Sequence, residues 1–125
     1  MMIIKSPYEL NETLGRLLKI LVEHEMTIFS IIDHSGGAAQ VGLTMPDTKL
    51  IIFGNPKAGT DLMLTDPNFS IDLPLKIVLR KNNEHTEILY QTVTELAMRY
   101  NGTEHNDSIR SIDKTIENML EKVIL

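Results

Sequence analysis

The residues with the clearest capacity for chemistry lie at the ends of two apolar segments. The first segment ends in IDH, residues 32–34, and the second runs into GNPKAGT, residues 54–60. An aspartate beside a histidine can orient an imidazole for general acid–base catalysis. Two glycines spaced around a lysine are similar in spacing to a phosphate-binding loop. The sequence therefore indicates two candidate chemistries, proton transfer at the end of the first segment and anion binding at the end of the second.

The glycine-containing segment departs from the phosphate-binding P-loop at the positions that matter. That pattern requires Lys and then Ser or Thr directly after the second glycine, whereas Thr60 and Asp61 stand there. Pro56 removes one backbone N–H donor, and Asp61 brings a negative charge toward any phosphate. We therefore reject a nucleoside triphosphate site. A small anion, a carboxylate or a phosphate group, could still bind beside Lys57 at a helix N-terminus.

A structural role explains much of the same segment. Asn55 precedes proline, so its backbone is pushed out of the helical region and its side chain can cap a helix that starts at Pro56. Gly54 permits a backbone conformation that a side chain would forbid. The pattern favours a corner in the fold over an anion site, and both interpretations stay open.

The aspartate–histidine pair also has two interpretations. Neighbours on a strand point to opposite faces, so Asp33 and His34 need not touch each other. Asp33 could instead bond local backbone N–H groups, with His34 at the sheet edge. The remaining histidines have no metal-ligand spacing and no HExxH pattern occurs. We therefore expect no metal site.

Composition excludes several classes of function. The chain has 125 residues, a formal net charge of −5 and no cysteine. The missing cysteines exclude disulfides, thiolate catalysis and Cys-ligated zinc or iron–sulfur centres. Scattered basic residues and an acidic balance argue against nucleic acid as a partner. No run approaches the roughly 18 apolar residues of a membrane span, and the N-terminus lacks signal-peptide features. We expect a cytoplasmic protein with no membrane partner and no cofactor.

Hydrophobic periodicity predicts the elements that must position these residues. Ser6, Pro7 and Glu9 together predict a capping box and the start of a first helix, with leucines following at helical spacing. Apolar or alternating segments predict five strands. They lie at residues 2–5, 27–32, 49–53, 75–80 and 86–90. Further helices are expected at 35–41, which Gly42 would end, from Pro56 up to Asp66-Pro67, at 93–100 and at 107–125.

The order of these elements is roughly β-α-β-α-β-α-β-β-α-α, within one domain spanning residues 1–125. The last two strands read as a hairpin joined at residues 82–85, so a purely parallel sheet is excluded. We predict the α+β class, with an antiparallel or mixed curved sheet of about five strands and helices packed mainly on one face. Residues 101–106 read as a short helix–helix connection before an amphipathic C-terminal helix.

Three motifs in order resemble the domain of unknown function 302 family. They are IDH at residues 32–34, FGNPKAGT with a following leucine–methionine pair at 53–63, and DLPL at 72–75. The resemblance covers about residues 4–100, and the C-terminal helix is less diagnostic. It implies a TATA-binding-protein-like α+β fold, a curved antiparallel sheet with helices against it, often as a homodimer. It implies no established reaction and no DNA binding.

We predict a homodimeric binding module for a small molecule or small anion, without established catalysis. One polar pocket would then be lined by residues from all three motifs: Asp33, His34, Asn55, Lys57, Thr60 and Asp72. An enzyme is the first alternative, with His34 as general acid–base and Asp33 or Asp72 as its orienter. A purely structural dimer module is the second. A shared pocket requires the ends of the two apolar segments to meet at the same edge of the sheet.

Overall fold

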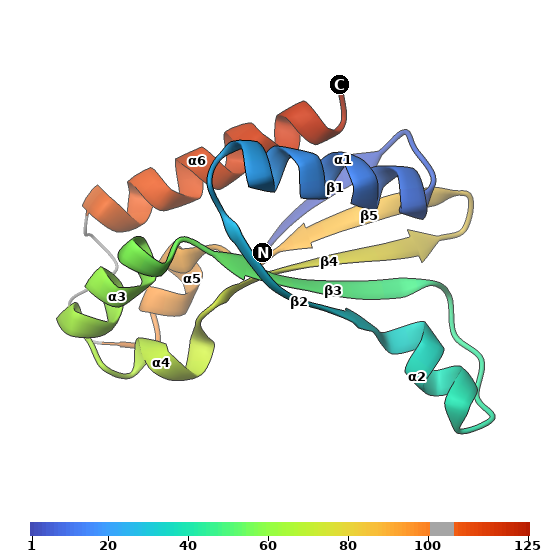
Figure 1. The fold of residues 1–125 in the computed structure, drawn as a ribbon, viewed down its shortest axis with the longest axis horizontal. Helices are drawn as coiled ribbons and strands as arrows, with labels where there is room; N and C mark the ends of the chain where they lie inside the picture. The colour runs from blue at the N-terminus through green and yellow to red at the C-terminus, as the bar shows by residue number, and fades with distance from the viewer. Residues whose placement is uncertain (101–106) are drawn as a thin grey trace.

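A five-stranded sheet forms the centre of the computed structural model, which describes residues 1–100 and 107–125 (Figure 1). Every neighbouring pair of strands is antiparallel. In sheet order the strands are β1 (Met2–Ser6), β5 (His85–Tyr90), β4 (Leu75–Asn82), β3 (Thr48–Gly54) and β2 (Thr27–Asp33). The predicted α+β class and strand segments are confirmed, and of the two sheet types considered the antiparallel one is present.

Two long helices, α1 (Leu10–Glu23) and α6 (Asp107–Val123), lie side by side over one face of the sheet (Figure 1). Shorter helices occupy the connections: α2 (His34–Gln40), α3 (Pro56–Thr65), α4 (Phe69–Asp72) and α5 (Val93–Ala97). The short α4, whose Phe69 is fully buried, was not predicted. The predicted connection at 101–106 lies outside the described residues.

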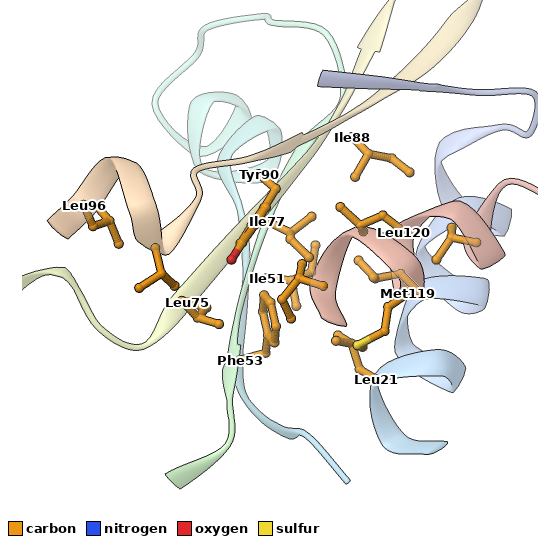
Figure 2. Packing of buried hydrophobic residues seen from close by; sticks show 14 of the residues in the cluster. Leu21, Ile51, Phe53, Leu75, Ile77, Ile88, Tyr90, Leu96, Met119 and Leu120 are labelled. Atoms are coloured by element: carbon orange, nitrogen blue, oxygen red, sulfur yellow. The ribbon is translucent and has the colours of Figure 1, made fainter. Parts of the chain in front are cut away.

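The core lies between α1, α6 and the face of the sheet that they cover (Figure 2). Alternate strand residues point into it because side chains on a strand alternate between faces. On β3 and β4 these are Ile51, Phe53, Ile77 and Leu79, all fully buried. The helices meet them with an aliphatic stripe at helical spacing: Leu17, Leu21, Ile116, Met119 and Leu120.

The opposite face of the sheet carries an aliphatic row that crosses all five strands. The strand register aligns one residue from each strand, from β1 to β2: Ile3, Leu89, Val78, Leu50 and Ile32. We call these five residues the outer row. Its two ends are 53% and 39% exposed, at Ile3 and Ile32. The three central side chains are only partly buried.

The predicted start of the first helix is wrong. Helix α1 begins at Leu10, and its N-cap Glu9 makes no side-chain capping bond. Ser6 cannot cap the helix because its backbone belongs to β1, where it pairs with Thr86. Its buried hydroxyl instead lies 2.7 Å from the Thr13 hydroxyl, one turn into α1. The serine therefore joins strand and helix by a side-chain hydrogen bond.

Helix α2 and its ending follow the prediction. The helix ends at Gln40, and Gly42 beyond it has φ +79°, a conformation that glycine adopts without strain. None of its seven residues is buried, and it projects from the body of the molecule beside the edge strand β2 (Figure 1). Among the described residues, no helix has both the length and the apolar character of a membrane span.

Candidate functional site

The GNPKAGT segment forms a capped corner between β3 and α3. Asn55 is the N-cap, and its side-chain oxygen accepts hydrogen bonds from the backbone N–H groups of Lys57 at 3.0 Å and Ala58 at 3.3 Å. Pro56 occupies the first helical position. The predicted cap and helix start are confirmed. The expectation for Gly54 is wrong, because the only described glycine with a positive φ is Gly42.

The capping pattern leaves the start of α3 poor in donors for an anion. Pro56 has no N–H, and those of Lys57 and Ala58 are bonded to the Asn55 side chain. The next N–H, from Gly59, donates to the backbone oxygen of Asn55 at 2.9 Å. A helix N-terminus binds anions through unpaired N–H groups. The corner geometry therefore argues against the predicted anion site.

A cavity of about 410 Å³ opens beside this corner. We call it the corner cavity. Its walls come from the start of β2, the end of β3, helix α3, the loop before β4 and one face of α6. The lining residues are Met26, Phe29, Gly54, Asn55, Pro56, Ala58, Gly59, Thr60, Leu62, Met63, Leu73, Pro74, Leu75, Ser111, Ile112 and Thr115.

Gly54 sits where the walls of the cavity come together. A Cβ at this position would lie 3.8 Å from the Phe29 ring and 3.9 Å from the Pro74 Cβ, which is ordinary contact distance. Phe29 is the bulged residue of β2, between Ile28 and Ser30 in the register with β3. A bulge re-aims a side chain relative to the regular strand alternation. The cavity thus depends on this irregularity as well as on the corner.

Few polar groups line the cavity. The Thr60 hydroxyl donates to the Pro56 carbonyl at 2.7 Å, and the Thr115 hydroxyl donates to the Ser111 carbonyl at 3.0 Å. Both hydroxyl oxygens keep the capacity to accept a bond from a ligand. Asn55 and Ser111 are the other lining residues with polar side chains. The remaining walls are aliphatic, aromatic, thioether or glycine.

The structure separates the six predicted site residues. Asn55 and Thr60 line the corner cavity, whereas Lys57 is exposed on α3 and is not among the lining residues. Asp72 ends α4, one residue before the cavity loop. These four therefore belong to one end of the sheet, but only two of them face the cavity.

Asp33 and His34 lie at the other end of the sheet, and the prediction of one shared pocket is wrong. In the β2–β3 register Asp33 pairs with Lys49, while Gly54 pairs with Thr27. The two pairs lie five positions apart along β3, which is about 17 Å at the rise of a strand. The reason is the antiparallel pairing, which places the C-terminal ends of β2 and β3 at opposite edges.

Asp33 acts as the N-cap of α2. Its carboxylate accepts a hydrogen bond from the Ser35 hydroxyl at 2.7 Å and from the Gly36 N–H at 3.0 Å. These bonds to Gly36 and Ser35 hold the pKa of Asp33 below its usual value. The carboxylate is thus used locally, as in the structural interpretation of the sequence, and does not orient His34.

Asp72 is the second carboxylate considered for His34, and it has other partners. It forms an ion pair with Arg99 at 2.7 Å and accepts a hydrogen bond from the Tyr100 hydroxyl. That bond raises the pKa of Tyr100. Asp72 therefore ties α4 to the residues that follow α5. Among the described residues, neither candidate carboxylate reaches the His34 ring.

The sequence reasoning missed Asp113, which is the most extensively bonded carboxylate among the described residues. It accepts bonds from the Tyr90 hydroxyl (2.8 Å), the Val93 N–H (2.8 Å), and the Thr94 N–H (2.9 Å) and hydroxyl (2.6 Å). Burial, and then the Asp113 charge, raise the pKa of Tyr90. The sequence held a signal: Asp113 falls on the apolar stripe of α6, where a carboxylate requires partners.

The sequence reasoning also missed the far wall of the cavity. Ser111, Ile112 and Thr115 reach it from α6, more than 50 positions along the chain from the corner. Ser111 and Thr115 are four residues apart, so they share one face of the helix. Their pairing with the corner is a tertiary contact, and no local pattern in the sequence predicts it.

The chain is similar to a known protein family and to a solved structure of that family. A family profile described as "Domain of unknown function DUF302" matches residues 2–124. The crystal structure of an uncharacterized conserved protein DUF302 from Bacillus stearothermophilus superposes with a TM-score of 0.79. That superposition covers 98% of this chain and 94% of the other, at 19% identity, which shows a shared fold.

Two curated relatives are proteins named fluoride-specific ion channels. FluC 1 of Brucella suis biovar 1 (strain 1330) and FluC 2 of Brucella melitensis biotype 1 (strain ATCC 23456) are each 38% identical to this chain over 73 residues. The match takes in 58% of this chain but only 29% and 27% of those proteins. It leaves most of each relative unmatched.

Proposed function

The chain belongs to the DUF302 family, and we propose that it is a homodimeric module that binds a small molecule in the corner cavity. The cavity itself carries the proposal. Its volume of about 410 Å³ falls within the range of roughly 300–1,000 Å³ that ligand pockets occupy. Apolar walls with a few fixed polar groups are also typical of such pockets.

The rigidity of the cavity walls favours a ligand-binding role for the corner over a purely structural one. Asn55 is fixed by two capping bonds and Thr60 by a bond to the Pro56 carbonyl. Fixed polar groups lose little freedom when a ligand binds, which favours affinity. We therefore assign ligand contacts to Asn55 and Thr60, and extend the predicted set to Ser111 and Thr115.

The corner cavity supports binding better than catalysis at His34. A histidine that acts as a general base is normally held by a partner on its second nitrogen. Asp33 and Asp72, the two candidates for that partner, are bonded elsewhere. We do not assign to this chain the channel function in the names of the Brucella relatives, because the match covers less than a third of each relative.

Ligand-observed NMR with a mixed fragment library tests the proposal. Ser111→Trp places a large ring at the α6 wall of the cavity, and Asn118→Trp places the same ring on an exposed α6 position outside it. Fragments that bind the wild type are expected to be lost in Ser111→Trp and retained in Asn118→Trp. Equal binding by both variants, or no bound fragment in the wild type, would refute the proposal.

The outer row supports the homodimer. Read across the sheet, it is Ile-Leu-Val-Leu-Ile, with Val78 at its centre on the middle strand β4. A two-fold axis through Val78 would match each end of the row to the other end in a second copy. Symmetric dimers use such self-complementary surfaces, and two sheets pack face to face through aliphatic side chains.

Sedimentation of two lysine variants tests the dimer. Val78→Lys puts a charge at the centre of the outer row, whereas Ile71→Lys puts it on α4, where Ile71 is 81% exposed. We expect a dimer for the wild type and Ile71→Lys, and a monomer for Val78→Lys with an unchanged circular dichroism spectrum. A wild-type monomer at every concentration would exclude the dimer. If Val78→Lys remained dimeric, the dimer interface would lie outside the outer row.

A further inference from the structure

The corner cavity has no ionisable side chain in its lining. Its sixteen lining residues include no Asp, Glu, Lys, Arg or His. The nearest corner cation, Lys57, is exposed outside the lining. A charged ligand placed there would lose its hydration without gaining an opposite charge, which is strongly unfavourable. The walls therefore favour a ligand with no net charge.

The apolar part of the lining favours an aromatic ring. Phe29 is half exposed at the cavity wall and can pair with a second ring edge to face. Met26 and Met63 add two thioethers to the same lining. Methionine sulfur contacts aromatic rings favourably and adapts to their shape. Aliphatic ligands would gain only the burial of their surface.

Among the α3 residues that line the cavity, Gly59 is the one without a side chain. A Cβ built at this position meets no atom within 4 Å, so the space beside it is open. Glycine within a helix is less stable than alanine, and no neighbouring atom requires a glycine here. The missing side chain widens the cavity at the cost of helix stability.

We propose that the corner cavity selects an uncharged molecule built on one aromatic ring with a hydroxyl or similar polar group, and that Gly59 leaves room for the ring. The polar group would bond the Asn55 amide or the Thr60 and Ser111 hydroxyls. This inference rests on the proposed function, since it names the class of ligand for the same site.

Isothermal titration with four matched probes tests the ligand class: benzyl alcohol, benzoate, benzylamine and cyclohexylmethanol. Benzyl alcohol is expected to bind at least about tenfold more tightly than the two charged probes, and several-fold more tightly than cyclohexylmethanol. Tighter binding of a charged or aliphatic probe at this cavity would overturn the inference while leaving the proposed function intact. If neither these probes nor any library fragment binds, the proposed function itself is refuted, and the inference on ligand class falls with it.

Two glycine-to-alanine variants test the role of Gly59. Gly59→Ala is paired with Gly15→Ala, because Gly15 lies within α1 and also has no atom within 4 Å of a built Cβ. Both variants are expected to raise Tm, as alanine favours the helix. Only Gly59→Ala is expected to weaken benzyl alcohol binding, by at least several-fold. Unchanged affinity in Gly59→Ala would refute the assigned role.

Discussion

Replacing Asp113 with alanine is expected to destabilise the fold more than any ordinary surface change on α6. The Asp113 carboxylate accepts four hydrogen bonds, from the Tyr90 hydroxyl, the Val93 N–H and two groups of Thr94. Tyr90 and Val93 are fully buried. The substitution leaves these two buried donors without their acceptor. The substitution should therefore weaken the attachment of α6 to the end of β5 and the start of α5.

The size of the effect follows from the two buried donors. Each buried donor left without an acceptor costs about 1–3 kcal/mol, so the pair costs about 2–6 kcal/mol in the free energy of unfolding. For a domain of this length, that corresponds to a fall in Tm of roughly 8–24 °C. Glu121→Ala, at an exposed position of the same helix, should change the stability by less than about 0.5 kcal/mol.

A double-mutant cycle separates this hydrogen-bond network from simple loss of packing. Tyr90→Phe alone removes one donor and should cost about 1 kcal/mol. When Asp113 is already alanine, the same change removes an unpaired hydroxyl and should cost nothing or restore stability, a coupling of about 1–2 kcal/mol. Urea unfolding followed by circular dichroism measures all four proteins. Additive effects within 0.3 kcal/mol or so would refute the reasoning.

Three further predictions concern the motifs singled out in the sequence. Asn55→Ala should cost about 1 kcal/mol in unfolding free energy, measured in urea, because it removes the cap of α3. Asp33→Asn keeps a capping residue but cannot titrate. Since the folded pKa of Asp33 is lowered, its contribution is present above the usual Asp pKa and lost as pH falls through the folded value. The variant should therefore lose less stability than the wild type when urea unfolding is repeated below about pH 4. His34→Ala should leave fragment binding to the corner cavity unchanged by NMR; a loss of binding would contradict the separation of the two strand ends.

The sequence could predict the elements because their signals are local. Alternating or continuous apolar residues mark each strand, and Asn55 with Pro56 marks the start of α3 within three positions of chain. Capping by Asp33 was recognised for the same reason, as one of two interpretations. The helix start predicted at Ser6 was wrong for a non-local reason. The sequence pattern of a capping box is present, but the pairing of Ser6 with Thr86 holds its backbone in the sheet.

The candidate site was harder to predict because it depends on pairing between distant segments. Whether Asp33 and Asn55 meet is decided by the direction of β3 relative to β2, which neither strand encodes by itself. The α6 wall at Ser111 and Thr115 joins the corner only through tertiary packing. The sequence motifs therefore predicted the corner. The cavity, and the absence of charged side chains from its lining, could be identified only from the folded structure.

Methionine-methyl NMR is the most direct test of the central claim that the corner forms the wall of a ligand cavity. With 13C-methyl methionine, benzyl alcohol is titrated into the wild-type protein. Met26 and Met63 line the cavity, whereas Met45 and Met98 are 39% and 72% exposed elsewhere on the surface. The account predicts saturable shifts at Met26 and Met63 and none at Met45 and Met98. Unchanged signals from Met26 and Met63, or equal shifts at all four methionines, would contradict it.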